Sequence, residues 1–421
     1  MEKFSLISLG CDKNLVDSEI FLAYMEKQGY VFTDNEEEAD LIIINTCCFI
    51  LDAKQESIDT ILRVAQYKSS GSLKKLIVCG CLGERYKDEI KKEIPEVDEV
   101  IGVDELENRL YHNGEIDRVL SGSGHSAYLK IADGCNKFCT YCIIPHIRGK
   151  YRSYPMEYLV KQAEKLAEGG VKELILVAQE TTLYGTDLYN KKCLPELLKR
   201  LCGIDGIKWI RILYAYPEEI TDELIETMAS QEKICHYIDM PIQHASDRIL
   251  RRMGRKTDKK DIVTIVGKLR KAMPDIAIRT TLISGFPGET EEDHRILVDF
   301  VKEMHFERLG VFAYSREEGT PAYDYDDQVP EEVKEARRDE IMSIQQEISS
   351  EFLSGMTENV LDVMIEGRLP DDGVLVGRTY MDAPDIDGYI FVNEKKRHES
   401  GDFIKAEVTD ASEYDLMGDE L

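Results

Sequence analysis

Continuous apolar runs alternate with helical patterns along the first hundred residues. Three runs end at Cys11, Cys47 and Cys81, and residues 97–103 predict a fourth strand. The stretches between them have the mixed polar and apolar spacing of helices. Uninterrupted apolar strands alternating with helices predict a parallel sheet with helices on its faces. Residues 117–125 are rich in Gly and Ser and predict a linker.

A second strand–helix series begins at residue 126. Helices such as 156–170 and 291–305 fit between its strands. Six strand–helix units are too few for a closed eight-stranded barrel, so we expect an open, partial (β/α)6 TIM-like barrel. A charged amphipathic helix over 330–355 follows it. The expected strands are 126–135, 172–179, 207–217, 236–243, 277–287 and 306–314.

From about residue 356 the pattern changes to short alternating strands, which predicts a small antiparallel β-barrel. The fold class is therefore α/β, with an N-terminal open parallel α/β domain, a partial barrel and a C-terminal β-barrel. We place the domains at 1–120, 121–355 and 356–421.

The composition is that of a globular protein, and 421 residues suit two or three domains. A formal charge of −28 disfavours broad electrostatic contact with nucleic acid and suits a basic partner. A well-solvated surface would explain the same charge. No apolar run approaches the roughly 20 residues of a membrane span, and the N-terminus is too short and polar for a signal peptide. We expect a cytoplasmic protein without membrane contact, whose eleven cysteines stay reduced.

Cys135, Cys139 and Cys142 lie in one loop with the spacing C-x-x-x-C-x-x-C. A structural zinc site or a ferredoxin-type cluster uses four protein ligands. Three thiolates leave one coordination position open, which is typical of a catalytic metal site. The alternatives are half of a zinc site or buried thiols.

Cys11, Cys47 and Cys81 are separated by 36 and 34 residues, and each ends a predicted strand. The carboxyl ends of parallel strands share one edge of a sheet, so the three thiols can converge into a second three-thiolate site. Cysteines of an ordinary core are the alternative. Spacing alone does not choose between Cys79 and Cys81, and only one of Cys47 and Cys48 should point at the site.

The three-cysteine loop, placed after the first strand of a barrel, resembles that of the radical S-adenosylmethionine (SAM) superfamily. The whole chain resembles its methylthiotransferase branch, with a C-terminal TRAM barrel, and details favour the RimO type. Asp12 and Lys13 stand where the relatives that modify transfer RNA typically have Gln and Met. The resemblance is carried by SLGCDKNLVDSE, INTCCFILDAKQESI, AYLKIADGCNKFCTYC, FERLGVFAYSREEGTPA and GRTYMDAPDIDGYIFV.

The resemblance implies two 4Fe–4S clusters, one held by Cys135, Cys139 and Cys142 and an auxiliary one held by Cys11, Cys47 and Cys81. It also implies methylthiolation of the β-carbon of an aspartate in small-subunit ribosomal protein number twelve. SAM would be both methyl donor and radical source, with a sulfur donor and an electron donor such as flavodoxin or ferredoxin. No general base reaches such a C–H proton, which is why radical chemistry is needed.

Further residues near the carboxyl edge of the barrel are candidate SAM contacts, since barrel sites form there. Ordinary capping and turn roles are the alternative for each of them. His146 and Arg148, which follow the cluster loop, are similar candidates. The candidate contacts are Tyr141, Gln179, Glu180, Arg211, Gln243, His244 and Gly285.

The C-terminal barrel is acidic. From residue 358 onward it has six Lys and Arg against seventeen Asp and Glu, a net charge of −11. Such a barrel repels phosphate and attracts a basic ribosomal protein, so transfer RNA is disfavoured as a partner. One rival function is a MiaB-like transfer-RNA adenosine methylthiotransferase. Another is an iron–sulfur electron carrier or redox sensor, which would close its clusters with four thiolates.

Overall fold

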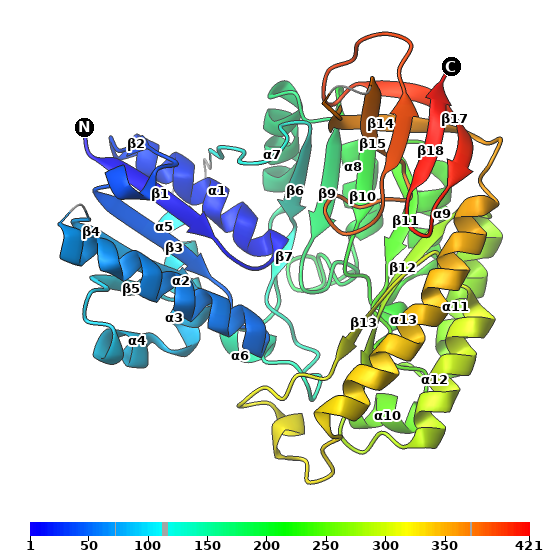
Figure 1. Ribbon diagram of the computed structural model, residues 1–421, viewed down its shortest axis with the longest axis horizontal. Coiled ribbons are helices and arrows are strands. Elements are labelled where there is room, and N and C mark those ends of the chain that lie inside the picture. Colours follow the sequence, from blue (N-terminus) through cyan, green and yellow to red (C-terminus); the bar gives the residue numbers. More distant parts are fainter. Residues whose placement is uncertain (72, 112–116, 371–372) are drawn as a thin grey trace. The chain divides into compact units, whose positions relative to one another are not determined.

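The computed structural model describes residues 1–71, 73–111, 117–370 and 373–421 (Figure 1). The chain divides into two compact units. Unit 1 comprises Met1–Ser121, Asp133–Arg152 and Ser315–Tyr323. Unit 2 comprises Gly122–Ala132, Ser153–Tyr314 and Asp324–Leu421. The three-domain division predicted from the sequence stays a prediction, because these units are drawn differently and group the cluster loop with the N-terminal sheet.

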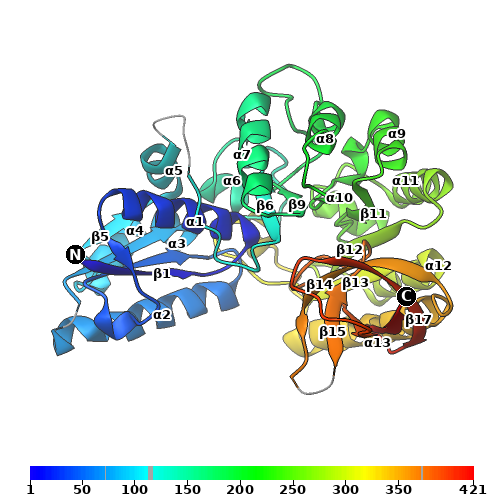
Figure 2. The same cartoon turned by 90° about the horizontal axis from the view of Figure 1, so that it is seen from above.

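Unit 1 is built on a five-stranded parallel sheet in the order β2-β1-β3-β4-β5. The four predicted strands are present. The additional strand β2 has only two residues, both exposed, so it has no apolar run to reveal it. Helices α1 and α2 cover opposite faces of the sheet (Figure 2). The strands are β1 Lys3–Ser8, β2 Val31–Phe32, β3 Leu41–Thr46, β4 Lys75–Gly80 and β5 Glu99–Ile101.

The helices of unit 1 connect these strands and follow the cluster loop. They are α1 Asp12–Lys27, η1 Glu36–Glu38, α2 Leu51–Ser70, α3 Cys81–Arg85, α4 Lys87–Glu93, α5 Val103–Tyr111 and α6 Ile144–Ile147. The short strands β7 Ala132–Asp133 and β8 Arg152–Ser153 form a two-stranded sheet where the chain passes between the units.

Unit 2 contains an open six-stranded parallel sheet in the order β13-β12-β11-β10-β9-β6. All six predicted strands are present, which confirms the partial (β/α)6 barrel. They are β6 Ser126–Lys130, β9 Glu173–Val177, β10 Trp209–Ile212, β11 Ile234–Asp239, β12 Ala277–Ser284 and β13 Arg308–Ala313. The helices are α7 Met156–Glu168, α8 Leu194–Cys202, α9 Asp222–Ser230, α10 Asp247–Arg252, α11 Lys259–Ala272, α12 Glu291–Met304 and α13 Glu331–Ser354, with the 3-10 turns η2 Pro217–Glu219 and η3 Pro321–Asp324.

The C-terminal strands of unit 2 close into the predicted β-barrel, in the order β14-β15-β16-β18-β17. Every neighbouring pair is antiparallel except β16 with β18. Strand β18 follows a short turn and was not predicted. The strands are β14 Val360–Arg368, β15 Val374–Arg378, β16 Ile390–Asn393, β17 Phe403–Ala411 and β18 Leu416–Glu420.

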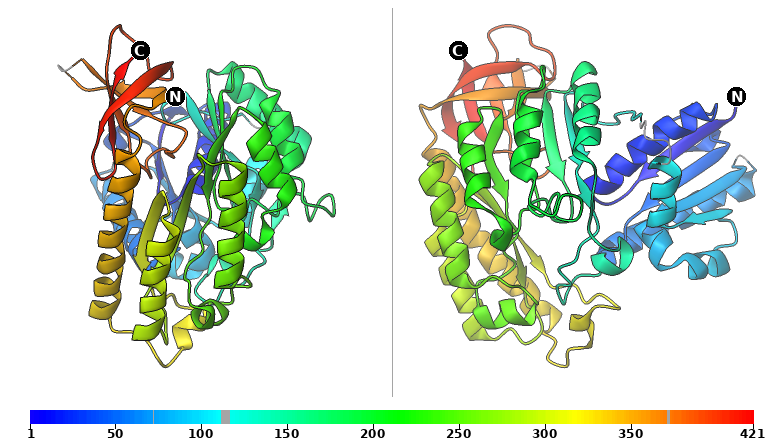
Figure 3. Two further views of the ribbon diagram at one scale, coloured as in Figure 1. Left: turned by 90° about the vertical axis from the view of Figure 1, so that its right-hand side faces the viewer. Right: turned by 180° about the vertical axis from the view of Figure 1, so that it is seen from behind.

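One hydrophobic core joins the six-stranded sheet to the β-barrel of the same unit. Figure 3 shows the backbone of both parts from two further sides. Trp209 and Tyr237 of the sheet pack in it with Met364 and Val392 of the barrel. The rings of Trp209 and Phe403 meet edge to face, with centroids 4.8 Å apart. Aromatic pairs in this geometry add to the stabilisation from buried area. The β-barrel is therefore a packed part of unit 2.

Candidate functional site

Cys11, Cys47 and Cys81 come together at the carboxyl edge of the unit 1 sheet. Cys11 precedes α1, Cys47 follows β3, and Cys81 opens α3 directly after β4. Because β1, β3 and β4 are parallel neighbours, their ends share one edge. Burial raises the pKa of Cys81 to about 12, and the charges of Cys11 and Cys47 also raise it. The ends of three neighbouring strands thus bring the segments that carry the three thiols to one edge.

Gly10 shows how tightly this edge is packed. It has a φ of +87°, and a Cβ atom there would lie 2.5 Å from Cβ of Cys47 and 2.8 Å from its Sγ. Gly80, before Cys81, and Gly134, before Cys135, also have positive φ. Glycine adopts this conformation without a steric penalty. A Gly-Cys pair with a positive φ at its glycine therefore recurs at Cys11, Cys81 and Cys135.

Cys48 and Cys79, the thiols that lie close to the predicted ligands in sequence, have surroundings of their own. The chain turns at Gly80, so Cys79 and Cys81 do not lie in one continuous strand. The pKa of Cys79 is raised by burial, and the nearby charges include those of Asp17 on α1 and Arg109 on α5. Cys48 is fully buried, and burial and then the charge of Cys81 raise its pKa to about 12. Burial and then the charge of Cys11 raise the pKa of Cys47, and the charge of Cys47 contributes to the raised pKa of Cys81.

The second group of thiols lies in the loop between β6 and α6. The N–H of Cys135 donates to the carbonyl of Gly149 at 3.1 Å and closes the base of the loop, and the N–H of Cys142 donates to Cys139 at 3.0 Å. The backbone N–H of Lys137 donates to Sγ of Cys135 at 3.4 Å. Burial raises the pKa of Cys142, and Cys139 and Cys135 raise it further. The loop therefore gathers its three thiols locally.

The donor set fits clusters better than single ions. Among the described residues, no three His, Cys, Asp or Glu side chains are placed to hold one metal ion. A cluster of several irons takes one thiolate per iron and spreads its ligands wider than a single ion does. Two groups of three thiols suit that arrangement, since soft thiolates select iron–sulfur clusters.

Arg148 lies between the cluster loop and the N-terminal sheet, within unit 1. Only 2% of it is exposed. One nitrogen lies 2.8 Å from Asp133, which precedes the loop, and another donates to Oδ1 of Asn14 on α1. Burial alone would lower the pKa of Arg148, but Asp133 and Cys81 raise it well above its usual value. The guanidinium therefore stays charged beside the thiols.

In unit 2, Gln179 and Ser284 lie at the carboxyl ends of strands β9 and β12. Oε1 of Gln179 and Oγ of Ser284 are buried and have no hydrogen-bond partner in the described structure. Buried polar atoms are normally paired, so these two are suited to a polar ligand. Gln243, between them in sheet order, has a φ of +72° and bridges to Leu282. Glu180 is fully buried and accepts hydrogen bonds from Thr182.

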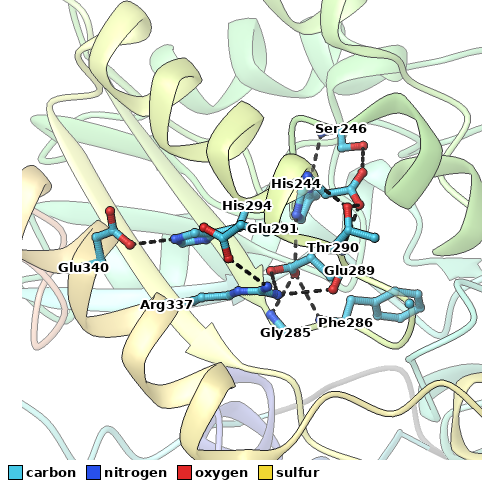
Figure 4. Close-up of polar contacts among 12 residues, drawn as sticks. His244, Ser246, Gly285, Phe286, Glu289, Thr290, Glu291, His294, Arg337 and Glu340 are labelled. Atoms are coloured by element: carbon cyan, nitrogen blue, oxygen red, sulfur yellow. Dashed lines mark hydrogen bonds and ion pairs between the residues drawn. The ribbon is translucent and has the colours of Figure 1, made fainter.

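A buried network around Glu289 fixes the loop that follows β12 (Figure 4). Oε2 of Glu289 accepts hydrogen bonds from the N–H groups of Gly285 and Phe286, at 2.8 and 3.2 Å. Nε2 of His244 lies 3.4 Å from the same oxygen, and Arg337 lies 2.9 Å from the other. Burial would raise the pKa of Glu289, but His244 and Arg337 lower it. His244 and Gly285 thus both contact Glu289 and help to hold this loop in place.

Arg211 lies elsewhere. It is fully buried, pairs with Glu173 at 2.9 Å and donates to the carbonyl of Tyr380 in the β-barrel at 2.7 Å. Arg378 of the barrel lies 2.6 Å from the same Glu173. Tyr141 is half-buried in the cluster loop of unit 1. The candidate SAM contacts therefore divide among three places, of which the carboxyl edge of the unit 2 sheet gathers Gln179, Glu180, Gln243, His244 and Gly285.

Comparisons with known proteins cover all parts of the chain. Residues 3–102 match the uncharacterized protein family UPF0004, residues 129–301 the radical SAM superfamily, and residues 359–420 the TRAM domain. The solved structure of TsrM, a radical SAM methyltransferase from Kitasatospora setae, superposes with a TM-score of 0.54 at 13% identity, over 76% of this chain and 77% of that one. OxsB, a cobalamin-dependent SAM radical enzyme, gives 0.51 at 12%, over 83% and 56%. These two likenesses concern the fold alone.

Closer relatives are found among curated proteins named ribosomal protein uS12 methylthiotransferase RimO. The one from Lachnoclostridium phytofermentans is 58% identical over 99% of both chains. Those from Clostridioides difficile and Acetivibrio thermocellus are 50% and 49% identical, covering 100% and 99% of this chain and 99% and 98% of the relatives.

The fold, its thiol groups and the domain matches define a radical SAM enzyme with a TRAM barrel. The chain belongs to the RimO family of methylthiotransferases. Membership implies SAM and two 4Fe–4S clusters as cofactors. Across the residues that the structure describes, helices are either too short or too polar to cross a membrane.

Proposed function

We propose that this chain adds a methylthio group to the β-carbon of an aspartate in ribosomal protein uS12. The observation that carries the proposal is the presence of two separate groups of three thiols in a chain 58% identical to a uS12 methylthiotransferase. An electron carrier would need four thiolates for each cluster.

The proposal assigns a role to each group of thiols. Cys135, Cys139 and Cys142 hold the cluster that binds SAM, while Cys11, Cys47 and Cys81 hold the auxiliary one. When bound, these groups supply the electron, the methyl group and the radical chemistry that an unactivated C–H bond requires. The chain itself orients them. Gly10 lets the Cys11 segment approach Cys47, and the Cys135–Gly149 hydrogen bond closes the base of the cluster loop.

SAM contacts are proposed at the carboxyl edge of the unit 2 sheet. Gln179 and Ser284 offer buried oxygens without a hydrogen-bond partner in the described structure, and Gln243 lies between their strands. His244 and Gly285 belong to the loop held by Glu289. Arg211 serves the junction between sheet and barrel instead, because contact with SAM would break its buried pair with Glu173.

The acidic TRAM barrel favours a protein substrate over RNA. Its net charge of −11 attracts a basic ribosomal protein and repels phosphate. The three-domain division, a cytoplasmic location and a flavodoxin or ferredoxin as electron donor complete the proposal. The domain matches at residues 3–102, 129–301 and 359–420 support the division.

A competition assay tests the substrate. The protein is reconstituted without oxygen and supplied with reductant, SAM and sulfide, together with ribosomal protein uS12 and unmodified transfer RNA in one vessel. Mass spectrometry should find a methylthio group on one aspartate of the protein and none on the RNA. Modified adenosine with unmodified protein would replace this proposal with the transfer-RNA function. Deoxyadenosine without either product would indicate a different substrate.

A further inference from the structure

Arg148 contacts residues on the segments that carry both groups of thiols. Its guanidinium reaches Asp133 at 2.8 Å and Asp17 at 3.6 Å, and it also donates to Asn14. Asn14 and Asp17 lie on α1, the helix that Cys11 precedes, while Asp133 precedes the cluster loop. One side chain thus connects the segments that carry the two groups of thiols.

The geometry needs an arginine. The planar guanidinium offers several donors in a fixed fork, so one nitrogen can face Asp133 while another faces Asn14. A lysine has a single nitrogen and cannot make both contacts with the same orientation. Asn14 is itself fixed, because its Nδ2 donates to the carbonyls of Leu9 at 2.9 Å and Thr46 at 3.0 Å. Those carbonyls lie within two residues of Cys11 and Cys47.

We propose that Arg148 is a positioning residue that places a fixed positive charge beside the auxiliary cluster and raises its reduction potential. The inference rests on the proposed assignment of Cys11, Cys47 and Cys81 as the ligands of that cluster. Reduction adds an electron to the cluster, and a buried cation stabilises the more negative state. Hydrogen bonds and charges next to thiolate ligands are known to set cluster potentials.

The auxiliary cluster can be measured alone in a full-length background with Cys135, Cys139 and Cys142 changed to alanine. In that background, Arg148→Gln removes the charge, while Arg148→Lys keeps it. Asn14→Asp places a negative charge against the guanidinium and also removes the amide donor that bonds the carbonyls of Leu9 and Thr46. Arg152→Gln is the matched control, since Arg152 pairs with Asp104 and Glu107 at a side-chain exposure of 40%. Iron and sulfide content and redox titration followed by electron paramagnetic resonance are the readouts.

We expect Arg148→Gln to lower the midpoint potential by at least the 59 mV that corresponds to a tenfold change for one electron. Asn14→Asp should shift it in the same direction, Arg148→Lys should shift it less, and Arg152→Gln should leave it unchanged. If Arg148→Gln does not load iron, Arg148→Lys decides the matter, because it keeps the charge while changing the contacts: a potential within 59 mV of the background supports the inference, and a larger fall overturns it. Full iron content with an unchanged potential in Arg148→Gln or Asn14→Asp overturns the inference.

The outcome for the proposed function is read separately. If the intact protein makes no methylthio product but the potentials shift as expected, the inference holds and the proposed substrate fails. If no cluster assembles on Cys11, Cys47 and Cys81 in the background protein, the ligand assignment fails, and the inference fails with it.

Discussion

The two groups of three thiols are assembled in opposite ways. Cys135, Cys139 and Cys142 lie within eight consecutive residues, and backbone hydrogen bonds inside the loop gather them. Cys11, Cys47 and Cys81 are dispersed over seventy residues and meet only because three parallel strands end at one edge. The first group is a property of a loop, and the second is a property of a sheet. Damage to the sheet should therefore affect one group and spare the other.

The largest expected effect comes from removing the local group. Changing Cys135, Cys139 and Cys142 together to alanine should abolish both deoxyadenosine and methylthio product and remove about half of the iron, because one cluster loses all its protein ligands. Iron analysis and product mass spectrometry measure this. Loss of nearly all iron would show that the two groups are not independent.

The dispersed group should depend on particular thiols. Cys81→Ala should lower methylthio formation at least a hundredfold while deoxyadenosine formation continues. Cys79→Ala is the matched control, two residues away and buried in β4, and we expect less than a threefold change. Both products are quantified in the same reaction. Equal losses in the two variants would reassign the ligand.

The junction between sheet and barrel in unit 2 carries none of the six candidate cluster ligands. A change there should alter stability without altering the thiol groups. Burial would raise the pKa of Glu173, but Arg378 and Arg211 lower it to about 2. Because its folded pKa lies below its unfolded value, Glu173 stabilises unit 2 above about pH 4.5, and this stabilisation is lost as the pH falls toward 2. Glu173→Gln should cost about 3–5 kcal/mol at pH 7.

Denaturant unfolding from pH 7 to pH 3 measures both effects. The natural protein should lose stability more steeply below pH 4.5 than Glu173→Gln does. Auxiliary iron content should be unchanged in the folded variant. An unchanged unfolding midpoint at pH 7 would contradict the importance of the buried pairs.

The smallest effect is expected from paired glycine changes. Gly10→Ala places a Cβ 2.5 Å from that of Cys47, and Gly134→Ala places one 2.3 Å from the carbonyl of Lys150. Each should reduce iron in its own cluster by a few fold, because positive φ and crowding both disfavour a side chain. Gly29→Ala, which meets nothing within 4 Å at a φ of +88°, is the control. Loss of iron from both clusters in either variant would contradict the separate assembly of the two groups.

The sequence predicted most of the fold because apolar runs mark buried strands. It missed β2, whose Val31 and Phe32 are 43% and 45% exposed, and the short closing strand β18. The convergence of Cys11, Cys47 and Cys81 was predictable because parallel topology determines where strand ends lie. The contacts of Arg211 and Arg148 were not, because partners such as Glu173 and Asn14 are brought near by packing and carry no local signal.

The shared core of the sheet and the TRAM barrel has a consequence for recombination. Arg279 and Arg308, on β12 and β13, pair with Asp387 and Asp382 of the barrel, as Arg211 reaches Tyr380. A chimera joined near residue 355 with a foreign, basic barrel would leave these arginines without their partners in the interior. Substrate preference is therefore exchangeable only when the inward-facing residues of the sheet are transplanted with the barrel.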